Sequence, residues 1–136
     1  MNASHWSSAT APDLATFRDI AHEAFEALPQ EFRAQCDGIV IAIDEFPTDI
    51  MLESVGAEDE FDLLGLFEGV GLAQTGGETF TGQQPNRIWL FRRPILDYWA
   101  GYDESLGAII THVLIHEIGH HFGLSDEDME AIEAEA

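Results

Sequence analysis

Residues 105–126 read SLGAIITHVLIHEIGHHFGLSD, and this stretch decides the fold. On a helix, its apolar side chains from Leu106 to Phe122 cover most of the circumference, which is typical of a helix buried in the middle of a domain. The same segment carries several histidines and a glutamate. We therefore predict a central helix over residues 105–122 that also holds the chemistry.

Two of these histidines have the spacing of metal ligands. His116 and His120 are four positions apart, so on a helix they differ by about 40° and project from one face. Two imidazoles one turn apart can bind a single zinc ion. Glu117 lies about 100° from His116, where its carboxylate can reach a water on the metal rather than the metal. A pair of hydrogen-bonded core histidines is the alternative interpretation, although burying these groups without a metal would be costly.

The residues after His120 offer a third ligand. Gly123 would fall on the same face, where it leaves room beside a metal and can adopt the left-handed conformation that ends a helix. Asp126 could then return as the third ligand and leave a fourth position for water, as catalytic zinc sites require. Alternatively, Ser125 or Asp126 simply caps a following helix that begins at SDEDM.

Two further histidines do not fit the same ion. His121 projects about 120° away from the metal direction, so we predict a packing or second-shell role. His112 is on the ligand face, but it precedes His120 by about 12 Å of helix, too far to share one zinc. We expect His112 to line the cleft or to hydrogen-bond near the site.

The rest of the chain predicts a single α+β domain over residues 12–136, preceded by a disordered segment over 1–11. An amphipathic pattern predicts a first helix that is capped by Thr10, has Pro12 in its first turn and ends around Pro29. Other expected elements are a buried strand at 39–43, a short helix or irregular crossing at 48–56, a long loop at 73–86, a strand at 87–91 and a short helix or turn from 94.

The charge balance excludes some functions. The chain has 26 acidic residues against five basic ones, all arginines, and a net charge of −21, so nucleic acid and anionic membranes are disfavoured as partners. Arg92 and Arg93 are expected to balance nearby acids rather than bind a substrate. Cys36 is the single cysteine, which fits a reducing compartment. With no signal sequence or membrane span recognisable, we expect a cytoplasmic protein.

The motifs also carry a resemblance. HEIGHHFGLSD fits the extended pattern H-E-x-x-H-x-x-G-x-x-D, and together with LLGLFEGVGL and NRIWLFRRPI it resembles Zincin_1, a small bacterial family of minimal zincin-like metallopeptidases, from about residue 12 to the end. The resemblance implies an α+β zincin core with a mixed sheet over the site helix and RIWLF as a candidate edge strand along the cleft. It implies zinc ligation by His116, His120 and Asp126, with Glu117 as the catalytic base. His112 departs from the family pattern.

The spacing argues against zincins whose third ligand is a glutamate on a later helix. Only sixteen residues follow His120, and their glutamates lie close behind Asp126. We therefore expect a zinc-dependent peptidase acting on a peptide or protein substrate. The alternative is a metal-binding protein of the zincin fold without general proteolytic activity, acting as a regulator or binding module. The sequence leaves the oligomeric state open.

Overall fold

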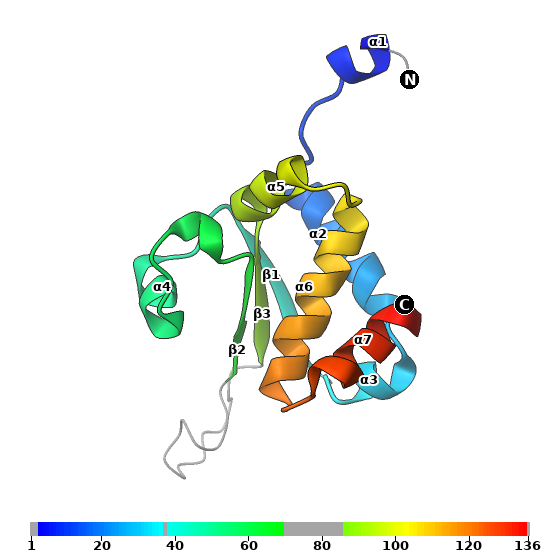
Figure 1. The fold of residues 1–136 in the computed structure, drawn as a ribbon, viewed down its shortest axis with the longest axis vertical. Helices are drawn as coiled ribbons and strands as arrows, with labels where there is room; N and C mark the ends of the chain where they lie inside the picture. The colour runs from blue at the N-terminus through cyan, green and yellow to red at the C-terminus, as the bar shows by residue number, and fades with distance from the viewer. Residues whose placement is uncertain (1–2, 37, 70–85, 136) are drawn as a thin grey trace.

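The central helix of the predicted fold is present as α6, Leu106–His121 (Figure 1). Ser105 caps it, because its side chain accepts the backbone N–H of Ala108. The computed structural model describes residues 3–36, 38–69 and 86–135. The other described elements are α1 (Ala3–Ser7), α2 (Leu14–Glu26), α3 (Gln30–Ala34), β1 (Val40–Asp44), α4 (Asp49–Val55), η1 (Glu60–Asp62), β2 (Gly65–Glu68), β3 (Arg87–Phe91), α5 (Arg92–Gly101) and α7 (Asp126–Glu135).

The three strands of the described residues form one mixed sheet in the order β1-β3-β2. β3 pairs in parallel with β1 and antiparallel with β2. The expectation that RIWLF is an edge strand is therefore wrong, since β3 is the central strand and β2 is the edge beside α6. The burial pattern of β3 agrees with the central position, because Ile88, Leu90 and Phe91 are fully buried.

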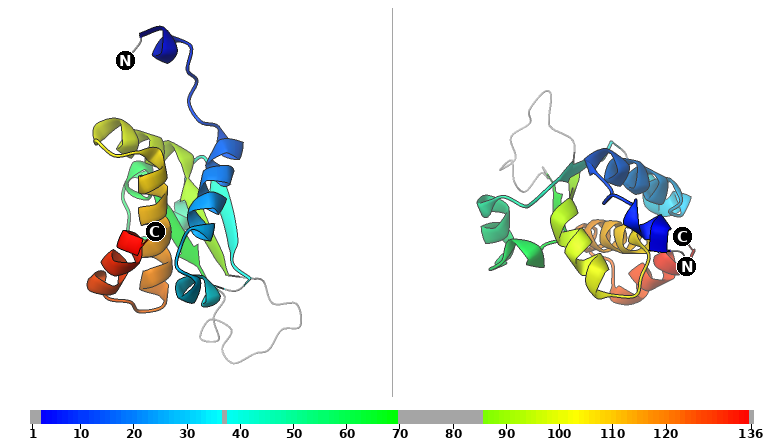
Figure 2. Two further views of the ribbon diagram at one scale, coloured as in Figure 1. Left: turned by 90° about the vertical axis from the view of Figure 1, so that its right-hand side faces the viewer. Right: turned by 90° about the horizontal axis from the view of Figure 1, so that it is seen from above.

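Helices α2 and α6 cover the same face of the sheet, and α4 lies on the other side (Figure 2). α2 contacts β1 and α6, whereas α6 contacts β2, β3, α5 and α7. The side chains between these layers form one apolar core, which includes Phe17 and Ala21 of α2, Ile88 and Leu90 of β3, and Ile110, Leu114, Ile115 and Ile118 of α6. Burial of the apolar surface of these side chains is the main driving force of folding.

The N-terminal part differs from the prediction in its boundaries. α2 begins at Leu14 because Asp13, not Thr10, accepts the backbone N–H of Thr16 as the cap. It ends at Glu26, and Pro29 precedes the separate short helix α3. Within the segment expected to be disordered, Ala3–Ser7 form α1, which Figure 1 shows apart from the body of the molecule.

The turn between α6 and α7 follows a Schellman motif. Gly123 has φ 73°, and its N–H donates to the carbonyl of His120, while Leu124 N–H donates to that of Gly119. Ser125 then caps α7, because its hydroxyl accepts the N–H of Asp128 and its own N–H donates to the Asp128 carboxylate. Asp126 is therefore the first residue of α7 and not its cap.

Several other expectations can be placed. Arg92 binds Glu45 at 2.9 Å and donates to the Pro12 carbonyl, so it has a structural role, as expected. Cys36 is buried, and burial raises the pKa of its thiol to about 11. The loop expected at 73–86 falls almost entirely outside the described residues. None of the described helices combines the length and the apolar character that a membrane crossing would require.

Candidate metal centre

One face of α6 presents three histidines at intervals of four residues. His112 and His120 are exposed, and His116 between them retains 24% side-chain exposure. The expectation that this ligand face is buried is wrong, because His120 is exposed and His116 and Glu117 are only partly buried. Solvent therefore reaches the imidazoles, and the burial penalty expected for unligated histidines is smaller than predicted.

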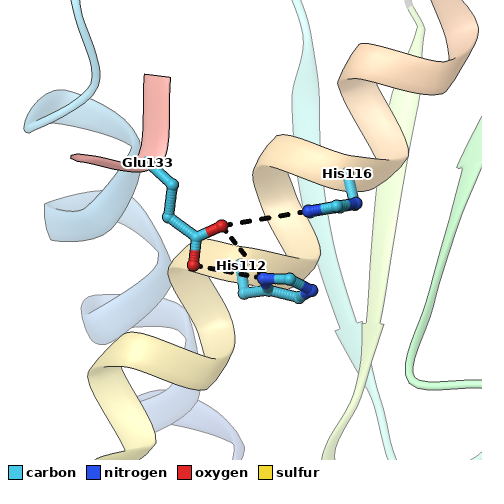
Figure 3. A group of neighbouring side chains, drawn as sticks. All are labelled: His112, His116 and Glu133. Atoms are coloured by element: carbon cyan, nitrogen blue, oxygen red, sulfur yellow. Dashed lines mark hydrogen bonds and ion pairs between the residues drawn. The ribbon is translucent and has the colours of Figure 1, made fainter. Parts of the chain in front are cut away.

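His116 lies beside His112 and Glu133 of α7 (Figure 3). Nδ1 of His112 is 3.0 and 3.1 Å from the two carboxylate oxygens of Glu133, and Nε2 of His116 is 3.8 Å from Oε1. The two imidazole rings stack with their centroids 4.0 Å apart. In the described parts of the chain, this is the group whose three possible metal ligand atoms lie within 4.8 Å of one another.

The ligand set predicted from the sequence is more open. The rings of His116 and His120 have centroids 5.9 Å apart and stand nearly perpendicular, at 84°. Burial and the charge of His112 lower the pKa of His116, whereas Glu133 and Asp126 lie near enough to oppose this decrease. His116 and His120 thus neighbour each other as the helical spacing requires, but they do not gather with Asp126 as closely as the first group does.

Glu117 borders a cavity of about 340 Å³ beside α6. Burial raises the pKa of its carboxyl, an effect partly opposed by His120 and by the backbone N–H of Phe67 in β2. The cavity is lined by Glu117, His112, His116, Ile109 and Val113 of α6, by Asp62, Leu63, Leu64 and Gly65 around the start of β2, and by Tyr98 and Glu104. A proton-accepting carboxyl therefore stands at the wall of a pocket that two imidazoles also reach.

His121 points away from this cavity. Its ring stacks on Phe67 of β2 with centroids 3.9 Å apart, as a packing residue would. The ring also packs closely on Gly69, where an added Cβ would lie 2.8 Å from it. His121 thus packs the end of α6 against the edge strand.

Sequence reasoning missed Glu133. The spacing argues against a glutamate of a later helix as the third ligand, whereas α7 runs back along α6 and brings Glu133 to His112 and His116. His112, which is expected to line the cleft or to hydrogen-bond near the site, contacts Glu133 through Nδ1 and lines the cavity. A usable signal was present, since His112 and His116 have the same spacing as His116 and His120.

The donors of this face suit zinc. Two imidazoles with one carboxylate are a ligand set of catalytic zinc sites, and both the His112–His116–Glu133 group and the His116–His120–Asp126 set supply it. Partial exposure gives an ion access. The chemistry of the donors therefore fits the metal, although the two sets must share His116.

Comparisons with known proteins identify the family of the chain. No match was found among the curated proteins. The structure is similar to that of a conserved hypothetical protein from Thermo thermophilus, with a TM-score of 0.51 and 19% sequence identity over 88% of this chain and 98% of that chain. At this identity the likeness concerns the fold. The profile of the Zincin_1 family, described as zincin-like metallopeptidases, matches residues 36–136, which include α6, α7 and the whole sheet. The chain therefore belongs to the zincin-like metallopeptidase family Zincin_1.

Proposed function

We propose that the chain is a zinc-dependent peptidase in which His116, His120 and Asp126 hold the metal and Glu117 is the general base. The observation that carries the proposal is the position of Glu117, half-buried at the wall of the cavity, one residue after His116 in the family's motif. Asp126 supports it, because Ser125 rather than Asp126 caps α7 and Asp126 is exposed.

Zinc bound there would polarise the substrate carbonyl and make a water more acidic. The task of Glu117 is to take the proton of the attacking water and deliver it to the leaving amine. A raised pKa suits this task, because a carboxylate whose pKa lies nearer to neutral pH accepts a proton more readily than an ordinary one. The backbone N–H of Phe67 helps to position Glu117, because it donates a hydrogen bond to this carboxyl group.

The substrate would lie along β2. As the edge of the sheet on the α6 side, β2 can pair with an extended peptide through main-chain hydrogen bonds. The adjoining cavity has an apolar wall from Leu63, Leu64 and Val113, and acidic groups at Asp62 and Glu104. This lining favours a peptide that places an apolar or basic side chain beside the bond to be cut.

The test is peptide hydrolysis by the zinc-loaded protein with Glu117→Gln. We expect the rate on a fluorogenic peptide mixture to fall by roughly 10²–10⁴-fold, the usual contribution of a general base, with zinc content unchanged. Glu130→Gln, a substitution of the same kind at an exposed position of α7, should leave the rate unaltered. Undiminished hydrolysis by Glu117→Gln, or no hydrolysis by the wild type, contradicts the proposal.

One observation favours the second candidate, a metal-binding protein without general proteolytic activity. The carboxylate of Glu133 lies 3.0 Å from His112 and 3.8 Å from His116, so these three side chains form a closer group than His116, His120 and Asp126 do. A wild-type protein that binds zinc tightly and cleaves none of the peptides would support this candidate.

A further inference from the structure

We propose that His112, His116 and Glu133 form a second zinc position, which shares His116 with the His116–His120–Asp126 set and therefore competes with it. The position itself stands on its own geometry. The competition rests on the proposed function, because it needs the other set to bind zinc as well.

The three side chains are already gathered. Their ligand atoms lie within 4.8 Å of one another, and the Glu133 carboxylate faces both imidazoles (Figure 3). His112 and Glu133 are 3.0 Å apart, and their side chains are 52% and 34% exposed. Small rotations of these two side chains would admit an ion between them. The group is thus both preorganised and accessible.

The backbone fixes this arrangement through a close contact between α6 and α7. Met129 packs on Gly119 so tightly that a Cβ at Gly119 would lie 2.5 Å from the Met129 sulfur. One turn further along α7 is Glu133, and one and two turns back along α6 are His116 and His112. Because the two helices run in opposite directions from the Gly123 turn, the Met129–Gly119 contact sets Glu133 level with the two histidines.

The chemistry of the group matches a divalent ion. Two neutral imidazoles and one carboxylate would leave a zinc ion with net charge +1 and a free coordination position. His112 and His116 both line the cavity, so an ion between them would have solvent or a small ligand on that side. The donor set and its access to solvent therefore both suit a bound zinc ion.

Competition follows from the shared residue. One imidazole nitrogen binds one ion. A zinc ion held by His112, His116 and Glu133 therefore leaves His120 and Asp126 without His116 as their partner ligand. The chain should then bind one zinc at this face rather than two, and zinc held by His112 and Glu133 would leave the Glu117 site without a complete ligand set. This arrangement would make peptide hydrolysis depend on which position is filled.

Zinc binding measured against a chromophoric chelator tests the proposal, using zinc-free full-length protein. His120→Asn removes the motif position, and we expect this variant still to bind one zinc per chain. Adding Glu133→Gln or His112→Asn to it should weaken zinc binding by more than about tenfold, since even indirect partners of a metal ligand cost 10–100-fold in affinity. Adding Glu130→Gln, the matched control on α7, should change nothing.

Three outcomes overturn the proposal: His120→Asn alone abolishes zinc binding, neither Glu133→Gln nor His112→Asn weakens the zinc binding of the His120→Asn protein, or the wild type binds two zinc ions at once. Circular dichroism of each variant establishes that the fold is retained. Failure of the proposed peptidase function would be seen in a different measurement. Peptide hydrolysis by the wild type and by Glu117→Gln reports on catalysis, whereas the number of zinc ions bound does not depend on Glu117.

Discussion

The two faces of α6 differ in what they contact and in what they expose. One face places Ile110, Leu114, Ile115 and Ile118, all fully buried, against the sheet and α2. The opposite face carries His112, His116 and His120, two of them exposed, beside a cavity. A single helix thus supports the core with one face and carries the metal ligands on the other, so substitutions on the two faces should have separable effects.

The largest effect should come from the apolar face. Ile115→Ala would leave a cavity at a fully buried site, and we expect the free energy of unfolding to fall by about 2–5 kcal/mol. Urea denaturation measures the loss. His120→Asn on the exposed face should change the free energy of unfolding of the metal-free protein by less than about 0.5 kcal/mol. Equal losses in the two variants would show that the faces are not separable.

A smaller effect is expected where α7 packs on α6. A methyl group at Gly119 would collide with Met129, and this overpacking should outweigh the gain in helix propensity, so we expect Gly119→Ala to lower the free energy of unfolding by about 1 kcal/mol. Gly107→Ala is the matched control, because a Cβ there meets nothing within 4 Å, and it should be neutral or stabilising by up to about 1 kcal/mol.

Gly119→Ala should also weaken zinc binding, since it displaces Glu133. A variant that loses neither stability nor zinc affinity contradicts the role of the Met129–Gly119 contact.

The smallest effect concerns the cap of α2, which packs on the apolar side. The backbone N–H of Thr16 holds the pKa of Asp13 below its ordinary value of 3.8. Since the pKa is lower in the folded state, the charged cap stabilises the fold above that value, and this contribution is lost as the pH falls through the folded-state pKa. Asp13→Asn keeps a capping side chain and removes the charge, so the variant should be less stable than the wild type at neutral pH, with the difference shrinking in acid. A difference that does not depend on pH would contradict this assignment, and zinc affinity should be unchanged throughout.

Much of this architecture follows from local patterns. The span of α6, the strands β1 and β3 and the turn at Gly123 could be predicted, because periodicity and turn residues report on the backbone near them. The central place of β3 could not, since strand order depends on partners far along the chain. The position of the α2 cap could not be predicted, because Thr10 and Asp13 both have side chains that can cap a helix, and the structure uses Asp13.

The candidate site divides in the same way. The helical spacing of His116, Glu117 and His120 could be read directly from the sequence. Glu133 could not, because its position depends on how closely α7 approaches α6, and that approach is set by Met129 and Gly119, two residues without metal chemistry. Exposure of the histidine face was also unpredictable from periodicity, which gives direction on a helix but not what covers it.

The parallel pairing at the centre of the sheet has a consequence for the order of folding. β1 and β3 join Val40 to Arg87, 47 positions apart, so this pairing must close a long loop before it brings any gain. The α6–α7 hairpin instead joins segments separated by a four-residue turn, and its contacts are local. We therefore expect the hairpin that carries the histidines to acquire structure early. The edge strand β2 should follow it, since even its nearest pairing with β3, Glu68 with Arg87, joins positions 19 apart. During folding, the metal ligands would be assembled before the strand along which a peptide could bind.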